Sequence, residues 1–92
     1  MDKHDRHYST PNTALAAYLL TEGFTLLSIT TSPNPKVIGG IEAVFTFQDD
    51  PHLLDCVRLW QTGQAEGNLI VFFGNYKRFL GEVKRATRRE TA

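Results

Sequence analysis

Cysteine is nearly absent from this sequence, since Cys56 is the only one among 92 residues. No disulfide can form within one chain, and this composition is compatible with a reducing compartment. Long apolar runs are absent too, because none approaches the roughly 20 residues of a membrane-spanning helix. The first residues, MDKHDRHYS, are polar and do not resemble a secretory signal. We therefore expect a cytoplasmic protein that does not insert into a membrane.

The sequence has no net charge, but its charges are unevenly distributed. Residues 77–92 hold six basic and two acidic side chains, whereas residues 1–76 hold four basic and eight acidic ones. This asymmetry indicates either a charge match within or between subunits, or a basic patch for an acidic partner. A chain of this length supports one domain with a modest core. We expect a mobile arm at residues 1–7 and a single domain at residues 8–92.

Two segments have the pattern of a capped amphipathic helix, and they cover residues 10–23 and 49–63. In each, a threonine or aspartate that can cap free backbone N–H groups precedes a proline at the first helical position. Each segment then ends at a glycine, which readily adopts the left-handed conformation that terminates helices. The caps are expected at Thr10 and at Asp49 or Asp50.

Between these helices, Phe24–Thr31 and Ile38–Gln48 have the composition and alternation of strands. The intervening loop contains two prolines, so an antiparallel hairpin is the simplest arrangement. Gly39 and Gly40 suggest a bulge or an irregular entry to the second strand. A hairpin keeps two open edges, and we therefore expect an edge-to-edge or face-to-face homodimer.

The C-terminal segment begins with an ambiguous stretch, Leu69–Phe73. LIVFF alone is typical of a strand, whereas from Phe72 onward apolar residues recur at helical spacings of three and four. We expect a short extended segment, with a third strand at Leu69–Val71 as one option, and then a helix from near Phe72 to about Arg89. The predicted fold is a small α+β domain in the order α-β-β-α-α, with the hairpin packed against helices.

Several short motifs occur in the same order as these elements. They are Tyr8-Ser9-Thr10, Leu15–Leu20 with Gly23-Phe24, Phe45–Phe47 with Asp49–Pro51, and Trp60 with Gly63 and Ala65. From Tyr8 to about Arg85, the chain thereby resembles a family of short phage and prophage proteins known as a domain of unknown function, DUF5659. The resemblance implies a mobile-element protein and supplies no activity or catalytic residue. The segment Ser32–Gly40 is longer than this family would lead one to expect, and Pro11-Asn12 departs from its usual first turn.

The strongest candidate for a binding surface is the basic end of the predicted C-terminal helix. Six cations flank its apolar stripe: Lys77, Arg78, Lys84, Arg85, Arg88 and Arg89. They would follow a phosphate backbone or meet an acidic protein. The alternative is a solvated helix end, where cations interact favourably with the helix dipole.

A second candidate is an anion site at Tyr8, Ser9 and Thr10, because free N–H groups at a helix N-terminus bind phosphate. Capping by Thr10 would explain the same residues without a ligand. The terminal residues His4 and His7 suit a metal chemically, but no rigid scaffold is expected there. We therefore expect no metal and no cofactor.

Catalysis is not expected either. His52 and Cys56 are one helical turn apart, which is compatible with an activated thiol. However, Cys56 lies among apolar residues of its helix, where a thiol usually acts as a small buried hydrophobic group. No set of nucleophile, base and orienting group can be assembled from the sequence.

We therefore expect a small non-enzymatic interaction protein of a phage or mobile element, with an anti-defence or regulatory role in the host cytoplasm. It would be a homodimer that binds a host or phage protein. One alternative is a nucleic-acid-binding accessory protein that uses the basic helix. Another is a nucleotide or small-molecule binder built around Tyr8–Thr10.

Overall fold

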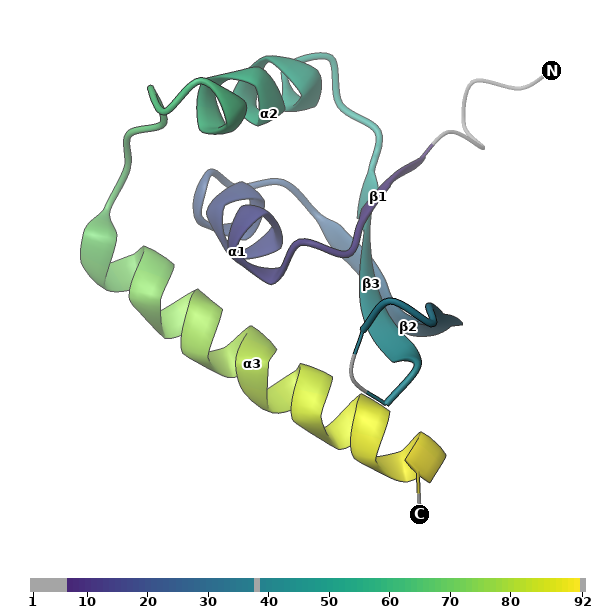
Figure 1. Cartoon of the computed structure of the whole chain (residues 1–92). Helices are drawn as coiled ribbons and strands as arrows, with labels where there is room; N and C mark the ends of the chain where they lie inside the picture. The colour runs from purple at the N-terminus through teal and green to yellow at the C-terminus, as the bar shows by residue number, and fades with distance from the viewer. Residues whose placement is uncertain (1–6, 38, 92) are drawn as a thin grey trace, which may run out of the picture.

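The computed structural model describes residues 7–37 and 39–91, and in this part of the chain three helices lie together on one side of a three-stranded antiparallel sheet (Figure 1). The sheet has the order β1-β3-β2, and its strands are β1 (His7–Thr10), β2 (Leu26–Pro33) and β3 (Ile41–Gln48). The helices are α1 (Thr13–Thr21), α2 (Leu53–Gln61) and α3 (Leu69–Thr91). The α+β class predicted from the sequence is confirmed.

The central strand, β3, carries the predicted alternation. Ala43, Phe45 and Phe47 are buried beneath the helices, while the residues between them are partly exposed on the opposite face. The ring of Phe45 stacks on that of Phe79 in α3, with centroids 4.8 Å apart. The core therefore lies between one face of the sheet and the helices, and α3 is held on it by an aromatic contact.

β1 is missing from the predicted order α-β-β-α-α. His7 pairs with Gln48 and Thr10 with Phe45, so β1 occupies the edge of β3 that the predicted hairpin would leave open. Four residues are too few for a clear alternation, which is why the sequence pattern does not reveal them. The rest of the predicted mobile arm, residues 1–6, lies outside the described residues.

The helix starts differ slightly from the prediction. The side chain of Asn12, rather than Thr10, caps α1, because its Oδ1 accepts a hydrogen bond from the Leu15 N–H at 3.1 Å. The Thr10 hydroxyl instead accepts from the Asn12 N–H at 3.1 Å. Asp50 closes the turn before α2 by accepting from the His52 N–H at 2.8 Å. The predicted ends are confirmed, since Gly23 and Gly63 both have positive φ.

The irregularity of the hairpin lies in β2. Leu26 faces Phe47 and Ser28 faces Thr46, so Leu27 is an extra residue that shifts the register. This bulge turns both Leu26 and Ile29 toward the core and leaves Leu27 exposed. Gly39 and Gly40 instead have positive φ in the turn that precedes β3.

The predicted third strand at Leu69–Val71 is wrong, because these residues form the first turn of α3. Asn68 caps this helix: its Oδ1 accepts from the Val71 N–H at 3.1 Å. Farther along, the side-chain amide of Asn75 donates to the Thr21 hydroxyl at 3.1 Å and ties α3 to α1. No helix in the described part of the chain is long and apolar enough to span a membrane.

Candidate binding surface

The basic residues predicted as a binding surface lie on α3, which runs along the edge of the molecule in Figure 1. Lys77, Arg78, Lys84 and Arg85 are all exposed. Among the described side chains, only Arg85 of these four forms an ion pair, with Glu82 on the same helix. Arg88 and Arg89 belong to α3, but their side chains lie outside the described part. The structure thus provides exposed positive charge that is mostly unpaired among the described side chains.

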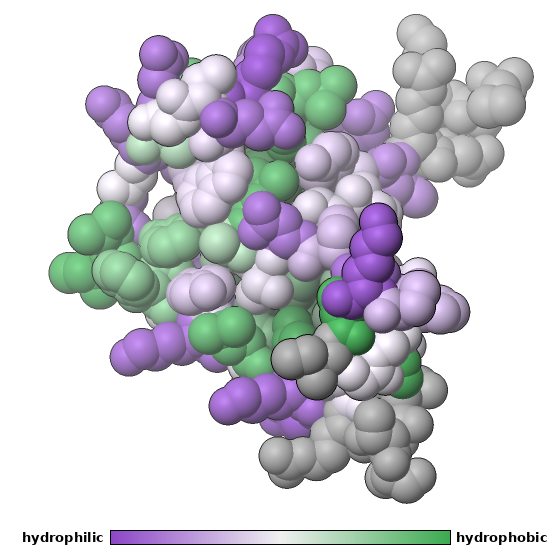
Figure 2. Space-filling view, viewed as in Figure 1, coloured by the Kyte–Doolittle hydropathy of each residue, from purple (hydrophilic) through white to green (hydrophobic). Residues whose placement is uncertain are grey.

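The same helix also exposes apolar side chains, which the sequence pattern did not predict. The exposed fractions are 85% for Ile70, 66% for Leu69, 51% for Phe73 and 40% for Leu80. Hydrophobic residues accordingly gather where α3 begins, at the left of Figure 2. The five consecutive apolar residues LIVFF could have indicated this exposure, because one helix face buries only three or four positions in two turns.

These apolar residues share one side of α3 with two lysines. Counting along the helix at intervals of three and four residues places them on a common face. We name this surface the outer α3 face and define it by Leu69, Ile70, Phe73, Lys77, Leu80 and Lys84. Phe79, which is fully buried in the core, lies on a different side of α3.

Two glycines, Gly74 and Gly81, interrupt α3 next to the outer α3 face. Nothing lies within 4 Å of the position that a Cβ would occupy at either residue. Each glycine costs a helix about 1 kcal/mol relative to alanine. Packing within the described chain therefore does not account for them.

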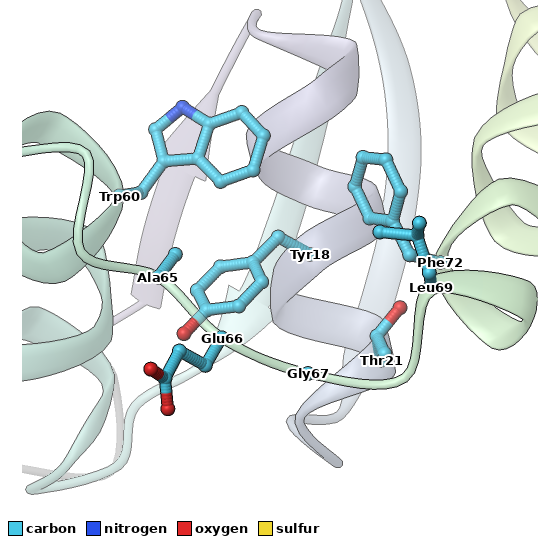
Figure 3. Close-up of a pocket in the computed structure, with 8 residues that line it drawn as sticks. All are labelled: Tyr18, Thr21, Trp60, Ala65, Glu66, Gly67, Leu69 and Phe72. Carbon is cyan, nitrogen blue, oxygen red and sulfur yellow. The ribbon is translucent and has the colours of Figure 1, made fainter.

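A small pocket lies next to the start of α3, between the three helices (Figure 3). It has a volume of about 150 Å³ and is lined mainly by aromatic and small side chains: Tyr18, Thr21, Trp60, Ala65, Glu66, Gly67, Leu69 and Phe72. The ring centroid of Trp60 is 5.4 Å from that of Tyr18 and 6.0 Å from that of Phe72. These three rings pack against one another and form an apolar wall of the pocket. The exposed Leu69 also lines it.

The surroundings of this pocket are acidic. Glu66 lines it, and the Oε2 of Glu22 lies 3.2 Å from the position that a Cβ on Gly67 would occupy. Burial, followed by the negative charge of Glu22, raises the pKa values of the Tyr18 hydroxyl and the Cys56 thiol. No ion pair neutralises Glu22 or Glu66 within the described side chains. Negative charge therefore lies just before α3, and positive charge lies toward its end.

The family model described as "Domain of unknown function (DUF5659)" matches residues 5–90. The chain belongs to this family. Neither the curated proteins nor the solved structures gave a match. The DUF5659 match includes β1, the pocket and nearly all of α3, so both the acidic and the basic surfaces are parts of the family domain.

Cys56, the thiol that was weighed as a nucleophile, lies in α2 at the margin of the core. The thiol is partly buried, and burial raises its pKa. His52 is exposed at the start of α2. Within residues 7–37 and 39–91, no group of three or more His, Cys, Asp or Glu side chains could hold a metal ion.

The residues of the predicted anion site, Tyr8, Ser9 and Thr10, belong to the strand that leads into α1 and not to the first turn of the helix. These residues lie in β1, where the Ser9 hydroxyl is hydrogen-bonded to that of Thr46 at 2.9 Å. The start of α1 is capped by Asn12 instead. Tyr8, Ser9 and Thr10 also do not line the pocket between the three helices.

Proposed function

We propose that this DUF5659 protein is a non-enzymatic interaction protein that binds a second protein through the outer α3 face. The exposure of Ile70, Leu69 and Phe73 on a regular helix is the observation that carries this proposal. Contiguous apolar side chains rimmed by polar residues are characteristic of interaction sites. A helix presents such residues at fixed intervals, so a partner can bind them with a groove or with a helix of its own.

The charges beside these apolar residues define the kind of partner. Lys77 and Lys84 are exposed on the same face and form no ion pair among the described side chains. A partner surface with an apolar ridge flanked by carboxylates fits this combination. The phage or mobile-element origin and the host cytoplasm implied by the family resemblance are compatible with such a role, as are the anti-defence and regulatory roles expected from the sequence.

Photo-crosslinking in cells tests this proposal. A crosslinking amino acid replaces Phe73 in one variant and Thr30, on the outer side of β2, in a control. We expect a discrete covalent adduct from position 73 and none from position 30, and we expect Ile70→Lys to remove the adduct. No adduct at position 73, or equal adducts at both positions, would contradict binding by the outer α3 face.

Nucleic-acid binding is the second candidate, favoured by the four exposed cations of α3. Mobility shifts with mixed-sequence DNA and RNA at low and physiological salt would detect it, since phosphate contacts are strongly salt-dependent. Ile70→Lys separates the two functions, because the added charge would strengthen nucleic-acid binding but disrupt an apolar protein contact. No shift at low salt would exclude this candidate.

A further inference from the structure

We infer that the partner of the outer α3 face is a second copy of this chain, whose α3 packs against it in the antiparallel direction. This inference rests on the proposed function, because it names the protein that this face binds. Residue spacing, charge placement and the two glycines of α3 each support it.

The outer α3 face has the periodicity of a helix that pairs with another helix. Its central residues alternate at intervals of three and four: Ile70, Phe73, Lys77, Leu80 and Lys84. When two such helices run antiparallel and cross near residue 75, Ile70 of each copy meets Leu80 of the other. Phe73 then meets Lys77, whose methylene stem packs on the ring while its ammonium group lies over it. The exposed apolar residues thereby cover one another.

The antiparallel direction also brings opposite charges together. In this direction Lys84 of one copy lies toward the loop that precedes α3 in the other copy, and this loop carries Glu66 next to Glu22. Neither acid is paired within its own described chain. A parallel pairing would instead place Lys77 and Lys84 against the same residues of the second copy. Charge complementarity therefore selects the antiparallel arrangement. It also accounts for an acidic body and a basic C-terminal segment in a chain without net charge.

The glycines of α3 fit the same arrangement. Gly74 lies beside the crossing point, and Gly81 lies toward the start of the other copy's helix. Because neither residue has a Cβ, both allow the two helices to approach closely. Within the described part of one chain, no atom lies within 4 Å of the position that either Cβ would occupy.

The outer face of the sheet is more polar than the outer α3 face, although Val44 is partly exposed on it. This sheet face carries hydroxyl groups such as those of Ser9, Thr30 and Thr46, two of which are hydrogen-bonded to each other. A polar surface of this kind provides little hydrophobic driving force for association. We therefore assign the dimer contact to α3 rather than to the outer face of the sheet.

Sedimentation velocity over about a hundredfold range of concentration tests the inference, because self-association obeys mass action. A single helix pair buries less than the roughly 800 Å² per partner of a standard interface, so we expect a dimer that dissociates on dilution. The wild-type mass should rise from 10.4 kDa to twice this value. Ile70→Lys should remain monomeric, whereas Val71→Lys, an exposed neighbour on another side of the same turn, should dimerise normally.

A charge exchange tests the direction of pairing. Glu66→Lys and Lys84→Glu should each weaken dimerisation about fivefold at low ionic strength, since both symmetric contacts are lost. The double variant should restore the wild-type affinity, which a parallel dimer would not do. Absence of this rescue would overturn the antiparallel arrangement.

The remaining outcomes separate this inference from the proposed function. A wild-type protein that stays at 10.4 kDa at every concentration would overturn self-association. Loss of dimerisation in Val71→Lys, to the same extent as in Ile70→Lys, would also overturn self-association through this face. A position-73 adduct with a mass other than two copies would keep the proposed function and reject the second copy as partner. No adduct would reject both.

Discussion

The helices α1 and α3 contain similar apolar stretches but differ in how much of each stretch is buried. The segment Leu15–Leu19 of α1 is buried throughout, and the helix carries no charge. By contrast, α3 buries Phe79 completely but exposes Leu69, Ile70 and Phe73. Apolar composition alone therefore does not distinguish a core helix from an interaction helix. What distinguishes them is whether the domain has enough surface left to cover every apolar side of the helix.

Two phenylalanines of α3 give the largest expected contrast. Phe79→Ala removes a buried ring that stacks on Phe45, and we expect the free energy of unfolding to fall by about 3–5 kcal/mol. Phe73→Ala truncates an exposed ring and should cost the monomer less than about 1 kcal/mol. Urea unfolding of dilute protein measures both values. Equal losses would show that Phe73 belongs to the core.

A second contrast compares glycines with different backbone conformations. Gly74→Ala should raise the free energy of unfolding of the monomer by about 0.5–1 kcal/mol, because alanine favours the helix. It should also weaken the proposed dimer. Gly63→Ala should instead lower stability by about 1 kcal/mol, because φ is +74° at this residue. Thermal unfolding at low protein concentration measures these effects, and destabilisation by Gly74→Ala would mean that this position is packed within the monomer.

The helix caps give an effect of similar or smaller size. Asn12→Ala and Asn68→Ala each remove a side-chain oxygen that accepts from a helix N–H, so we expect losses of about 1 kcal/mol. The Asn12 variant should destabilise the whole domain, because α1 lies in the core. The Asn68 variant should mainly fray the first turn of α3, where amide hydrogen exchange would accelerate. Global destabilisation by Asn68→Ala would contradict this division.

The smallest expected effect concerns pH. Because the pKa of Cys56 is raised in the folded protein, the thiol of the unfolded chain ionises first as pH rises. The free energy of unfolding should therefore decline above about pH 8.5, once the unfolded thiol loses its proton. Cys56→Ser removes the ionisable thiol with little change in size, and the decline of its stability should begin at higher pH. An increase in wild-type stability over this range would contradict the raised pKa.

Much of the fold followed from local sequence signals. The alternation around Phe45 and the glycines at residues 23 and 63 correctly predicted a strand and two helix ends. The sequence pattern did not predict β1, because its four residues form a strand only by pairing with β3, which is distant in sequence. The bulge at Leu27 likewise depends on the register with β3. Such non-local pairings have little local signature.

The candidate surface was only partly predictable. The cations from Lys77 to Arg85 were predicted from their spacing, but Leu69 and Ile70 were expected in an extended segment, and Phe73 and Leu80 were counted in the apolar stripe of the helix. Which apolar residues are buried depends on how α3 packs on Phe45 and Thr21, and this is a tertiary property. Likewise, the acidic residues beside α3 are brought there by the turn after α1 and by the loop before α3.

Two-dimensional ¹⁵N NMR spectra of this 10.4 kDa protein at high and low concentration test the central claim most directly. We expect concentration-dependent shifts at residues 66–84, with the largest at Ile70, Phe73 and Leu80. The amides of α1 and of the outer sheet face should change little. Shifts centred on β1 and β2, or spectra that do not change with concentration, would contradict a second copy bound to the outer α3 face.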